Sequence, residues 1–107
     1  MSRLEKLKRE LLALLDIMVQ GGLSQTTRTC GTRSCVCHRD PARRHGPHLY
    51  WTFREQGKSR ALYVPAQHTE QARQAQAAWA RFWEIGCQLS ALNRKRLLTD
   101  WKRERAS

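Results

Sequence analysis

The sequence predicts an α+β fold in which two long helices, packed antiparallel, flank a small zinc-stapled loop and a β-hairpin. Three observations predict it: apolar residues at helical spacing toward both ends, period-two alternation in the middle, and three cysteines within eight residues. The chain has 107 residues, of which 40% are hydrophobic, so it is long enough for one domain over residues 1–107. A core of that size is modest, and a bound metal would add to its stability.

The N-terminal helix is predicted over residues 1–20. Its apolar residues recur at steps of three and four, which is typical of one face of an amphipathic helix. They are Leu4, Leu7, Leu11, Leu14 and Met18, and Leu12, Leu15 and Ile17 widen the stripe. Gly21 and Gly22 are expected to end the helix, because glycine readily takes the left-handed conformation that closes one.

The middle segment, residues 23–65, is predicted to hold the metal loop and the hairpin. Apolar and polar residues alternate over residues 49–54 and again over 61–64, as they do in half-buried strands. The residues between the two strands, 55–59, include Gly57, so the pair is expected to form a hairpin with a tight, basic tip.

The C-terminal helix is predicted over residues 69–103, with Thr69 as its cap and a break near Gly86. One apolar stripe runs along it: Ala72, Ala75, Trp79, Phe82, Ile85, Leu89 and Leu92. Aromatic residues at helical spacing belong more often to a core than to a base-stacking surface, so we expect them to pack against the first helix.

The net charge of +11 is concentrated in two segments. Residues 25–65 carry eight basic and two acidic side chains, and residues 94–107 carry six and two. Such a charge attracts polyanions, so nucleic acid is the expected partner. No apolar run is long enough to cross a bilayer, so no membrane is expected. The predicted contacts are Arg28, Arg33, Arg39, Arg43, Arg44, Arg54, Lys58 and Arg60, interleaved with Tyr50, Trp51 and Tyr63. The basic tail is equally well explained as a solvated helix end.

The strongest chemical signal is a cluster of metal ligands. Cys30, Cys35 and Cys37 are followed by three nearby histidines, all within a stretch of nineteen residues, and a tetrahedral Zn²⁺ needs one more ligand. His45 is favoured, since it returns after a loop long enough to fold back; His38 would point away from the metal and His48 starts the strand. The alternatives are His38 or His48 as the fourth ligand, or cysteines that merely fill a core.

These residues resemble an uncharacterised family of short bacterial proteins, many of them encoded near transposases and other mobile-element genes. The shared pieces are Arg28-Thr29-Cys30-Gly31, Cys35-Val36-Cys37, His45-Gly46-Pro47, Gly57-Lys58 and Tyr63-Val64-Pro65, within residues 21–95. The resemblance implies a mobile-DNA context, hence DNA rather than RNA as the partner, and supports His45 over His38. The chain departs from the pattern in having His48 where an aromatic residue is common.

The sequence therefore favours a zinc-binding, nucleic-acid-binding accessory protein of the cytoplasm. The alternative is a protein-binding subunit whose helical pair docks on a recombinase or transposase, or joins copies of this chain. No catalytic function is expected, because no nucleophile motif or phosphate-binding glycine loop occurs. A hydrolase would need only three cysteines on the metal, a bound water and Glu55 as the base.

Overall fold

The computed structural model describes residues 1–106, which form a mixed α and β fold, as expected. The elements, in chain order, are α1 (Arg3–Leu14), β1 (Gly22–Arg28), β2 (His45–Glu55), β3 (Lys58–Val64) and α2 (Thr69–Ala106), with three 3-10 turns, η1 (Val36–His38), η2 (Pro41–Arg43) and η3 (Ala66–His68). The chain packs as two compact units, one made of residues 1–19 and 77–106 and the other of residues 20–76. A compact unit need not fold by itself. The single domain over residues 1–107 therefore stays a prediction.

Helix α1 is shorter than predicted. It starts after Ser2, whose hydroxyl accepts a hydrogen bond from the Glu5 N–H at 3.1 Å and so caps the first turn. It ends at Leu14, whose carbonyl accepts from the N–H groups of both Ile17 and Met18. The expected extension to residue 20 is wrong, because an aspartate and two β-branched residues follow Leu14, and these are weaker helix formers.

The apolar stripe of α1 is correct in position but narrower than predicted. The five residues at three- and four-residue steps are all buried or half-buried: Leu4, Leu7, Leu11, Leu14 and Met18. The three residues expected to widen the stripe are exposed: Leu12, Leu15 and Ile17. Of these only Leu12 lies in α1, because Leu15, Ile17 and Met18 follow the last residue of the helix.

Helix α2 is continuous over 38 residues and reaches three residues further than predicted. The expected break near Gly86 is wrong, since a single glycine costs a helix only about 1 kcal/mol and good helix formers surround this one. Thr69 does not cap the helix from outside, because its own backbone is helical and it follows directly on η3. Among the described residues, no helix combines the length and the apolar character needed to cross a bilayer.

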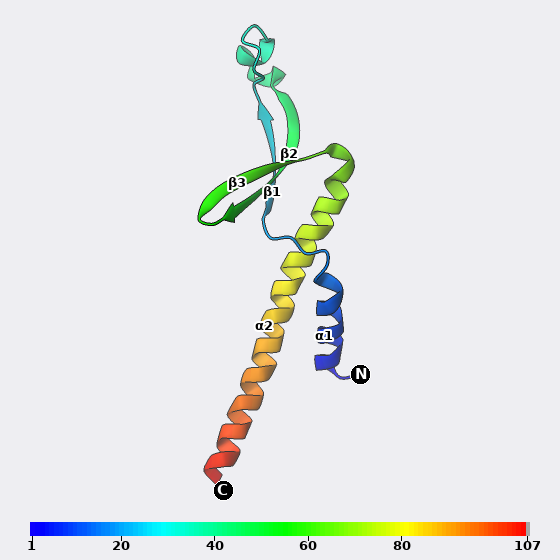
Figure 1. Ribbon diagram of the computed structural model, residues 1–107, viewed down its shortest axis with the longest axis vertical. Helices are drawn as coiled ribbons and strands as arrows, with labels where there is room; N and C mark the ends of the chain where they lie inside the picture. Colours follow the sequence, from blue (N-terminus) through cyan, green and yellow to red (C-terminus); the bar gives the residue numbers. More distant parts are fainter. Residues whose placement is uncertain (107) are drawn as a thin grey trace. The chain divides into compact units, whose positions relative to one another are not determined.

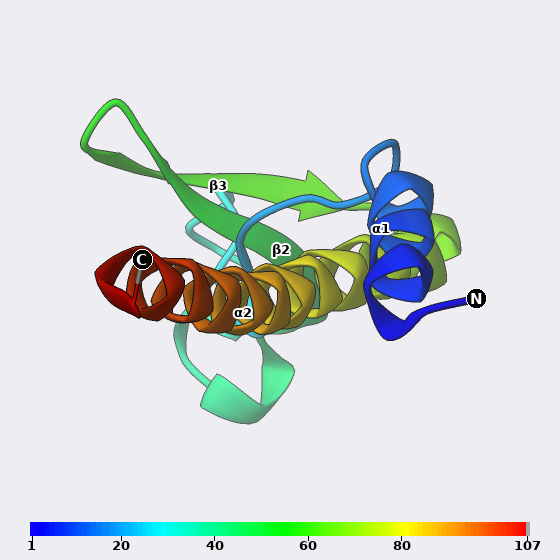
Figure 2. The same ribbon diagram turned by 90° about the horizontal axis from the view of Figure 1, so that it is seen from below.

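In the first unit, α1 lies beside α2 (Figure 2) and packs against it around a small core. Leu7, Ala78 and Ile85 are buried there, and Ile85 has no exposed surface. Arg81 binds Glu10 through two of its guanidinium nitrogens, and this contact lowers the pKa of Glu10. The predicted pair of two long antiparallel helices is not found, because α1 has only 12 residues against 38 in α2.

The last turns of α2 have no cover within the described residues. At 1.5 Å per residue, α1 is about 18 Å long and α2 about 57 Å, so α1 reaches along only part of α2. The predicted stripe of α2 is at least half-buried as far as Leu92, whereas residues 93–106 are all exposed. Leu97, Leu98 and Trp101 are the large apolar side chains in that exposed stretch.

The second unit is built on a three-stranded antiparallel sheet in the order β1-β2-β3 (Figure 1). Leu23 of β1, Trp51 of β2 and Leu62 of β3 lie opposite one another in the register. Residues 49–52 of β2 are paired on both sides, while the strand before them pairs only with β1 and the strand after them only with β3. The β2–β3 hairpin was predicted, but β1 was not.

Gly21 is required for the packing of the sheet and does not end α1. Its φ is +140°, and a Cβ atom placed there would overlap the indole ring of Trp51. That ring is buried, and its Nε1–H donates a hydrogen bond to the Gln20 carbonyl at 2.8 Å. Glycine is therefore needed because the backbone passes directly against the indole.

Candidate metal centre

Strand pairing brings the two ends of the cysteine loop together. Strands β1 and β2 run antiparallel, and Arg28 near the end of β1 is paired with His45 at the start of β2. Cys30 follows β1 after a single residue, so it lies close to His45 although fifteen positions separate the two in the sequence. The sheet thus holds the first and last ligands of the cluster at one end of a two-stranded ribbon.

The loop between β1 and β2 is wound into two 3-10 turns (Figure 1). In η1, the N–H groups of His38 and Arg39 bond the carbonyls of Cys35 and Val36 at 3.1 and 3.0 Å. The second turn, η2, is capped by Asp40, whose carboxylate accepts a hydrogen bond from the third residue of the Asp-Pro-Ala sequence. These local hydrogen bonds fix the backbone that carries the middle ligands.

Four side chains converge at the end of the ribbon: Cys30, Cys35, Cys37 and His45, whose ligand atoms all lie within 4.8 Å of one another. The Cys30 and Cys37 sulfurs are 3.6 Å apart, and the Cys35 sulfur is 3.5 Å from His45 Nε2. In a zinc tetrahedron with Zn–S bonds of about 2.3 Å, neighbouring ligand atoms are separated by about 3.8 Å. The spacing therefore suits one tetrahedral ion.

The cluster also has a supporting shell. Cys37 is only 1% exposed, and its sulfur accepts a hydrogen bond from the Cys30 N–H at 3.3 Å. Such bonds orient a thiolate and stabilise its charge when it binds a metal. All the cysteines are free thiols, and a sulfur separation of 3.6 Å is far longer than a disulfide bond of about 2 Å.

The contacts within the cluster favour the charged forms of two thiols and of the imidazole. A hydrogen bond with the Thr32 backbone lowers the pKa of Cys30 to about 6, and a hydrogen bond with the Cys37 backbone lowers the pKa of Cys35. The pKa of His45 is raised by its hydrogen bond to Cys35. Burial raises the pKa of Cys37, so this thiol depends most on a cation for its deprotonation.

The other two histidines lie outside the cluster. The His38 ring is turned to the backbone, with Nε2 at 2.7 Å from the Cys30 carbonyl. His48 packs edge-on against Tyr63, with ring centroids 5.8 Å apart. The sequence argument for His45 thus agrees with the geometry, and His38 has a supporting role, since it holds the backbone of a ligand residue.

The predicted nucleic-acid contacts are all exposed, but they fall into two groups: Arg28, Arg33, Arg39, Arg43 and Arg44 lie on or beside the loop, and Arg54, Lys58 and Arg60 surround the β2–β3 turn. The groups are joined by β2, whose ten residue steps amount to about 33 Å. Two members of the turn group have internal partners: Arg54 donates to the Gly57 carbonyl at 2.8 Å, and Arg60 lies 4.0 Å from Glu55.

The position of Glu55 bears on the hydrolase alternative. Glu55 ends β2 and pairs with Lys58 at the turn, whereas His45 starts the same strand beside the cluster. A carboxylate at the other end of an 11-residue strand is not placed to activate a water on the metal.

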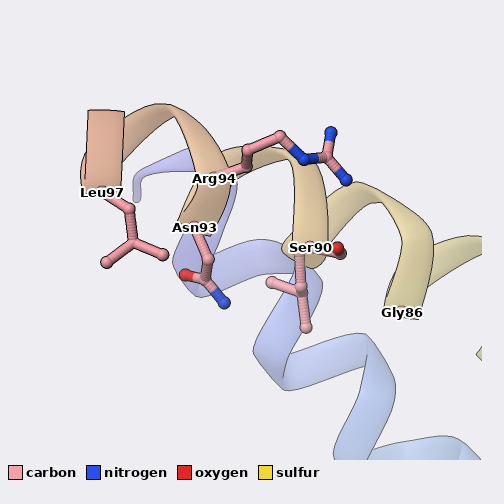
Figure 3. Close-up of a pocket in the computed structure, with 6 residues that line it drawn as sticks. Gly86, Ser90, Asn93, Arg94 and Leu97 are labelled. Carbon is pink, nitrogen blue, oxygen red and sulfur yellow. The ribbon is translucent and has the colours of Figure 1, made fainter. Parts of the chain in front are cut away.

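The first unit has a groove on its surface. Its lining residues all come from successive turns of α2 (Figure 3): Gly86, Leu89, Ser90, Asn93, Arg94 and Leu97. Gly86 opens it, because a Cβ atom there would meet nothing within 4 Å. Three of the six lining residues are polar, and one of these, Arg94, is charged.

Trp51 lies on a different face of the sheet from the two tyrosines. The sequence prediction named it with Tyr50 and Tyr63 among the aromatic residues interleaved with the nucleic-acid contacts, but Trp51 is buried. The tyrosines lie on the other face, where the Arg28 guanidinium carbon is 4.2 Å from the centroid of the Tyr50 ring. The period-two alternation of residues 48–54 contained the signal that separates the two faces.

Fold and site together define a small α+β protein in which one loop carries a Cys₃His candidate metal centre among exposed arginines. The chain belongs to the family described as domain of unknown function (DUF6788), whose model matches residues 1–74. A search of curated proteins and one of solved structures find no significant match. The match to this family includes every residue of the candidate metal centre and the whole sheet.

Proposed function

We propose that this protein binds zinc and nucleic acid, DNA rather than RNA, and that it acts as an accessory factor of mobile elements without catalytic activity of its own. The observation that carries the proposal is the loop of the metal centre, where exposed arginines are interspersed along the sequence with the four candidate ligands. The mobile-element setting rests on the resemblance over residues 21–95.

The charge of the loop is suited to phosphate. Among the described residues, Arg33, Arg39, Arg43 and Arg44 have no ion-pair partner, so their guanidinium groups are available to a ligand. Zinc bound by three thiolates and a histidine lowers the local charge by only one, so the surface stays strongly basic. Arginine also offers forked contacts that match phosphate oxygens and guanine edges.

The metal serves structure in this proposal. Four protein ligands complete the tetrahedral shell of zinc and leave no position for a water or a substrate. The ion would close the loop between β1 and β2, hold the arginines in a fixed arrangement and so reduce the entropy lost when they bind.

A salt titration tests the proposal. The wild-type protein, reduced and zinc-loaded, is mixed with a fluorescent DNA duplex, and the dissociation constant is measured over a range of salt concentrations. We expect tight binding at low salt. The logarithm of the association constant should fall linearly with the logarithm of salt concentration, because each phosphate contact releases about one counterion. Absence of binding at low salt would reject it.

A second candidate function rests on the exposed end of α2. Leu97, Leu98 and Trp101 are large apolar side chains in solvent, which is typical of a surface that meets another protein. In this alternative the helix docks on a recombinase or transposase, and the basic loop contacts DNA only within that complex. The salt titration separates the two candidates, because the second predicts weak binding by the isolated protein.

A further inference from the structure

The two faces of the β-sheet have different characters. Side chains alternate along a strand, so directly paired residues share a face, except at Arg28 and His45, where the register shifts after Thr26. One face carries Leu49 and Trp51, which are buried. The other carries the following residues, which we call the tyrosine face: Ser24, Thr26, Arg28, His48, Tyr50, Thr52, Arg54, Ser59, Ala61 and Tyr63. Most of these residues are exposed, and the rest are half-buried.

The rings on the tyrosine face support one another. Tyr50 and Tyr63 are directly paired on β2 and β3, with ring centroids 5.9 Å apart and a 62° angle between the ring planes. His48 meets Tyr63 edge-on at 5.8 Å, and Arg28 lies over the Tyr50 ring. Tyr63 remains 54% exposed. An ordered ring with that much free surface is a platform on which a flat group can stack.

The charge of the tyrosine face is entirely positive. Its ten residues include Arg28 and Arg54 and no carboxylate. The acidic residue of the hairpin, Glu55, is paired with Lys58 and lies near Arg60, on the opposite face. The face therefore attracts a polyanion and offers it aromatic rings as well.

We propose that the tyrosine face binds single-stranded nucleic acid, with an unpaired base stacked on Tyr63 and a phosphate held by Arg28. The inference rests on the proposed function and adds to it the class of nucleic acid. Bases within a duplex are stacked on each other and cannot reach a ring on a sheet, whereas those of a single strand can.

The residues of the tyrosine face are placed so that a single strand of nucleic acid could pass along the sheet. Arg28 lies at the metal-centre end of β1, and Arg54 lies beside the β2–β3 turn, with Tyr50 and Tyr63 between them. A backbone that follows β2 would thus meet a cation at each end and aromatic rings in the middle. In other proteins, surfaces that combine positive charge with stacking aromatic rings bind about 4–16 nucleotides of single strand per domain.

The test compares a single-stranded oligonucleotide of about 16 nucleotides with the duplex of the same sequence, using full-length, zinc-loaded protein and fluorescence anisotropy. Tyr63→Ala should weaken single-strand binding by about 5- to 150-fold, the equivalent of one base stack of about 1–3 kcal/mol. Tyr63→Phe keeps the ring and should bind like the wild type. Leu62→Ala is the matched control, because Leu62 is the preceding residue, is 58% exposed and lies on the other face.

A second measurement does not depend on the folding of a variant. An oligonucleotide carrying a photoreactive iodouracil base is bound to the wild-type protein and irradiated, and the cross-linked residue is identified by mass spectrometry. A cross-link at Tyr63 supports the inference. Cross-links confined to Trp83 or Trp101, the exposed tryptophans of α2, would overturn it.

The outcomes also separate this inference from the proposed function. If Tyr63→Ala keeps duplex binding and binds the single strand more weakly by about 5- to 150-fold, both are supported. If Tyr63→Ala binds the single strand as well as the wild type does, the tyrosine face is not the site, although the protein still binds nucleic acid. If the wild type binds neither oligonucleotide, the proposed function fails and the inference fails with it.

Discussion

Arg28 is paired with His45 at the last register position of the β1–β2 ladder, where the sheet ends and the candidate metal centre begins. The same two strands therefore position a ligand of the centre and a cation of the tyrosine face. The guanidinium of Arg28 reaches back over Tyr50, while the imidazole of His45 points to the cysteines. A change in the metal centre should consequently alter the position of Arg28 on the tyrosine face.

The first prediction concerns metal content. Protein purified under reducing conditions without added zinc should contain one zinc ion per chain, because four ligand atoms within 4.8 Å of one another match a single tetrahedral ion. Elemental analysis of freshly prepared protein gives the ratio. A content below half an equivalent would contradict the assignment.

The second prediction compares two cysteines. Cys35→Ser should make the loop between β1 and β2 sensitive to proteases, since it removes a ligand and metal affinity contributes to local folding. Cys87→Ser is the control, because Cys87 is an exposed residue of α2 that lies outside the cluster. Limited proteolysis followed by mass spectrometry locates the cuts. Equal sensitivity of the two variants would count against a metal role for Cys35.

The third prediction concerns pH. In metal-free protein, Cys30 should be alkylated by iodoacetamide with a midpoint near pH 6, since its pKa is lowered to about 6 and the thiolate is the reactive form. The reactive thiolate of Cys30 is present above the midpoint and is protonated as the pH falls through it. Zinc affinity should fall over the same range, because protons then compete with the ion. A midpoint near the pKa of an ordinary thiol would contradict the lowered pKa of Cys30.

The fourth prediction ranks the basic surfaces. Replacing Arg43, Arg44, Arg54 and Lys58 together by alanine should weaken DNA binding and flatten its salt dependence, by about one unit of slope for each phosphate that is no longer neutralised. Zinc content and helix content should not change, because all four side chains are exposed.

The matched variant for that prediction replaces Arg94, Lys95 and Arg96 of α2, which are also exposed. It should have a smaller effect if this end of the helix is a solvated face. Loss of binding by this variant, with binding kept by the first, would move the nucleic-acid surface from the loop and hairpin to α2.

The fifth prediction concerns the core of the first unit. Ile85→Ala should lower the free energy of unfolding by about 2–5 kcal/mol, because the side chain has no exposed surface and its removal leaves a cavity. Leu97→Ala, on an exposed turn of the same helix, should stay within about 0.5 kcal/mol of the wild type. Urea denaturation followed by circular dichroism measures both. Similar losses would mean that the end of α2 is covered in solution.

The ligands and the central part of the fold were already determined by local features of the sequence. Helical spacing identified the buried line of α1 and the stripe of α2, and alternation identified the β2–β3 hairpin. The three cysteines and His45 could be named as candidate ligands because a zinc shell needs four ligands and the intervening loop is long enough to fold back. Each of these signals lies within a short stretch of chain.

Other features were decided only by the tertiary structure. Strand β1 has five exposed residues at the edge of the sheet, so burial left no alternation in its sequence, and only pairing with β2 defines it. Gly21 could be taken for a helix end because the indole that requires it lies thirty positions away. The tyrosine face likewise needs the register that pairs Tyr50 with Tyr63. Contacts between distant segments depend on how strands align, and local spacing does not encode that alignment.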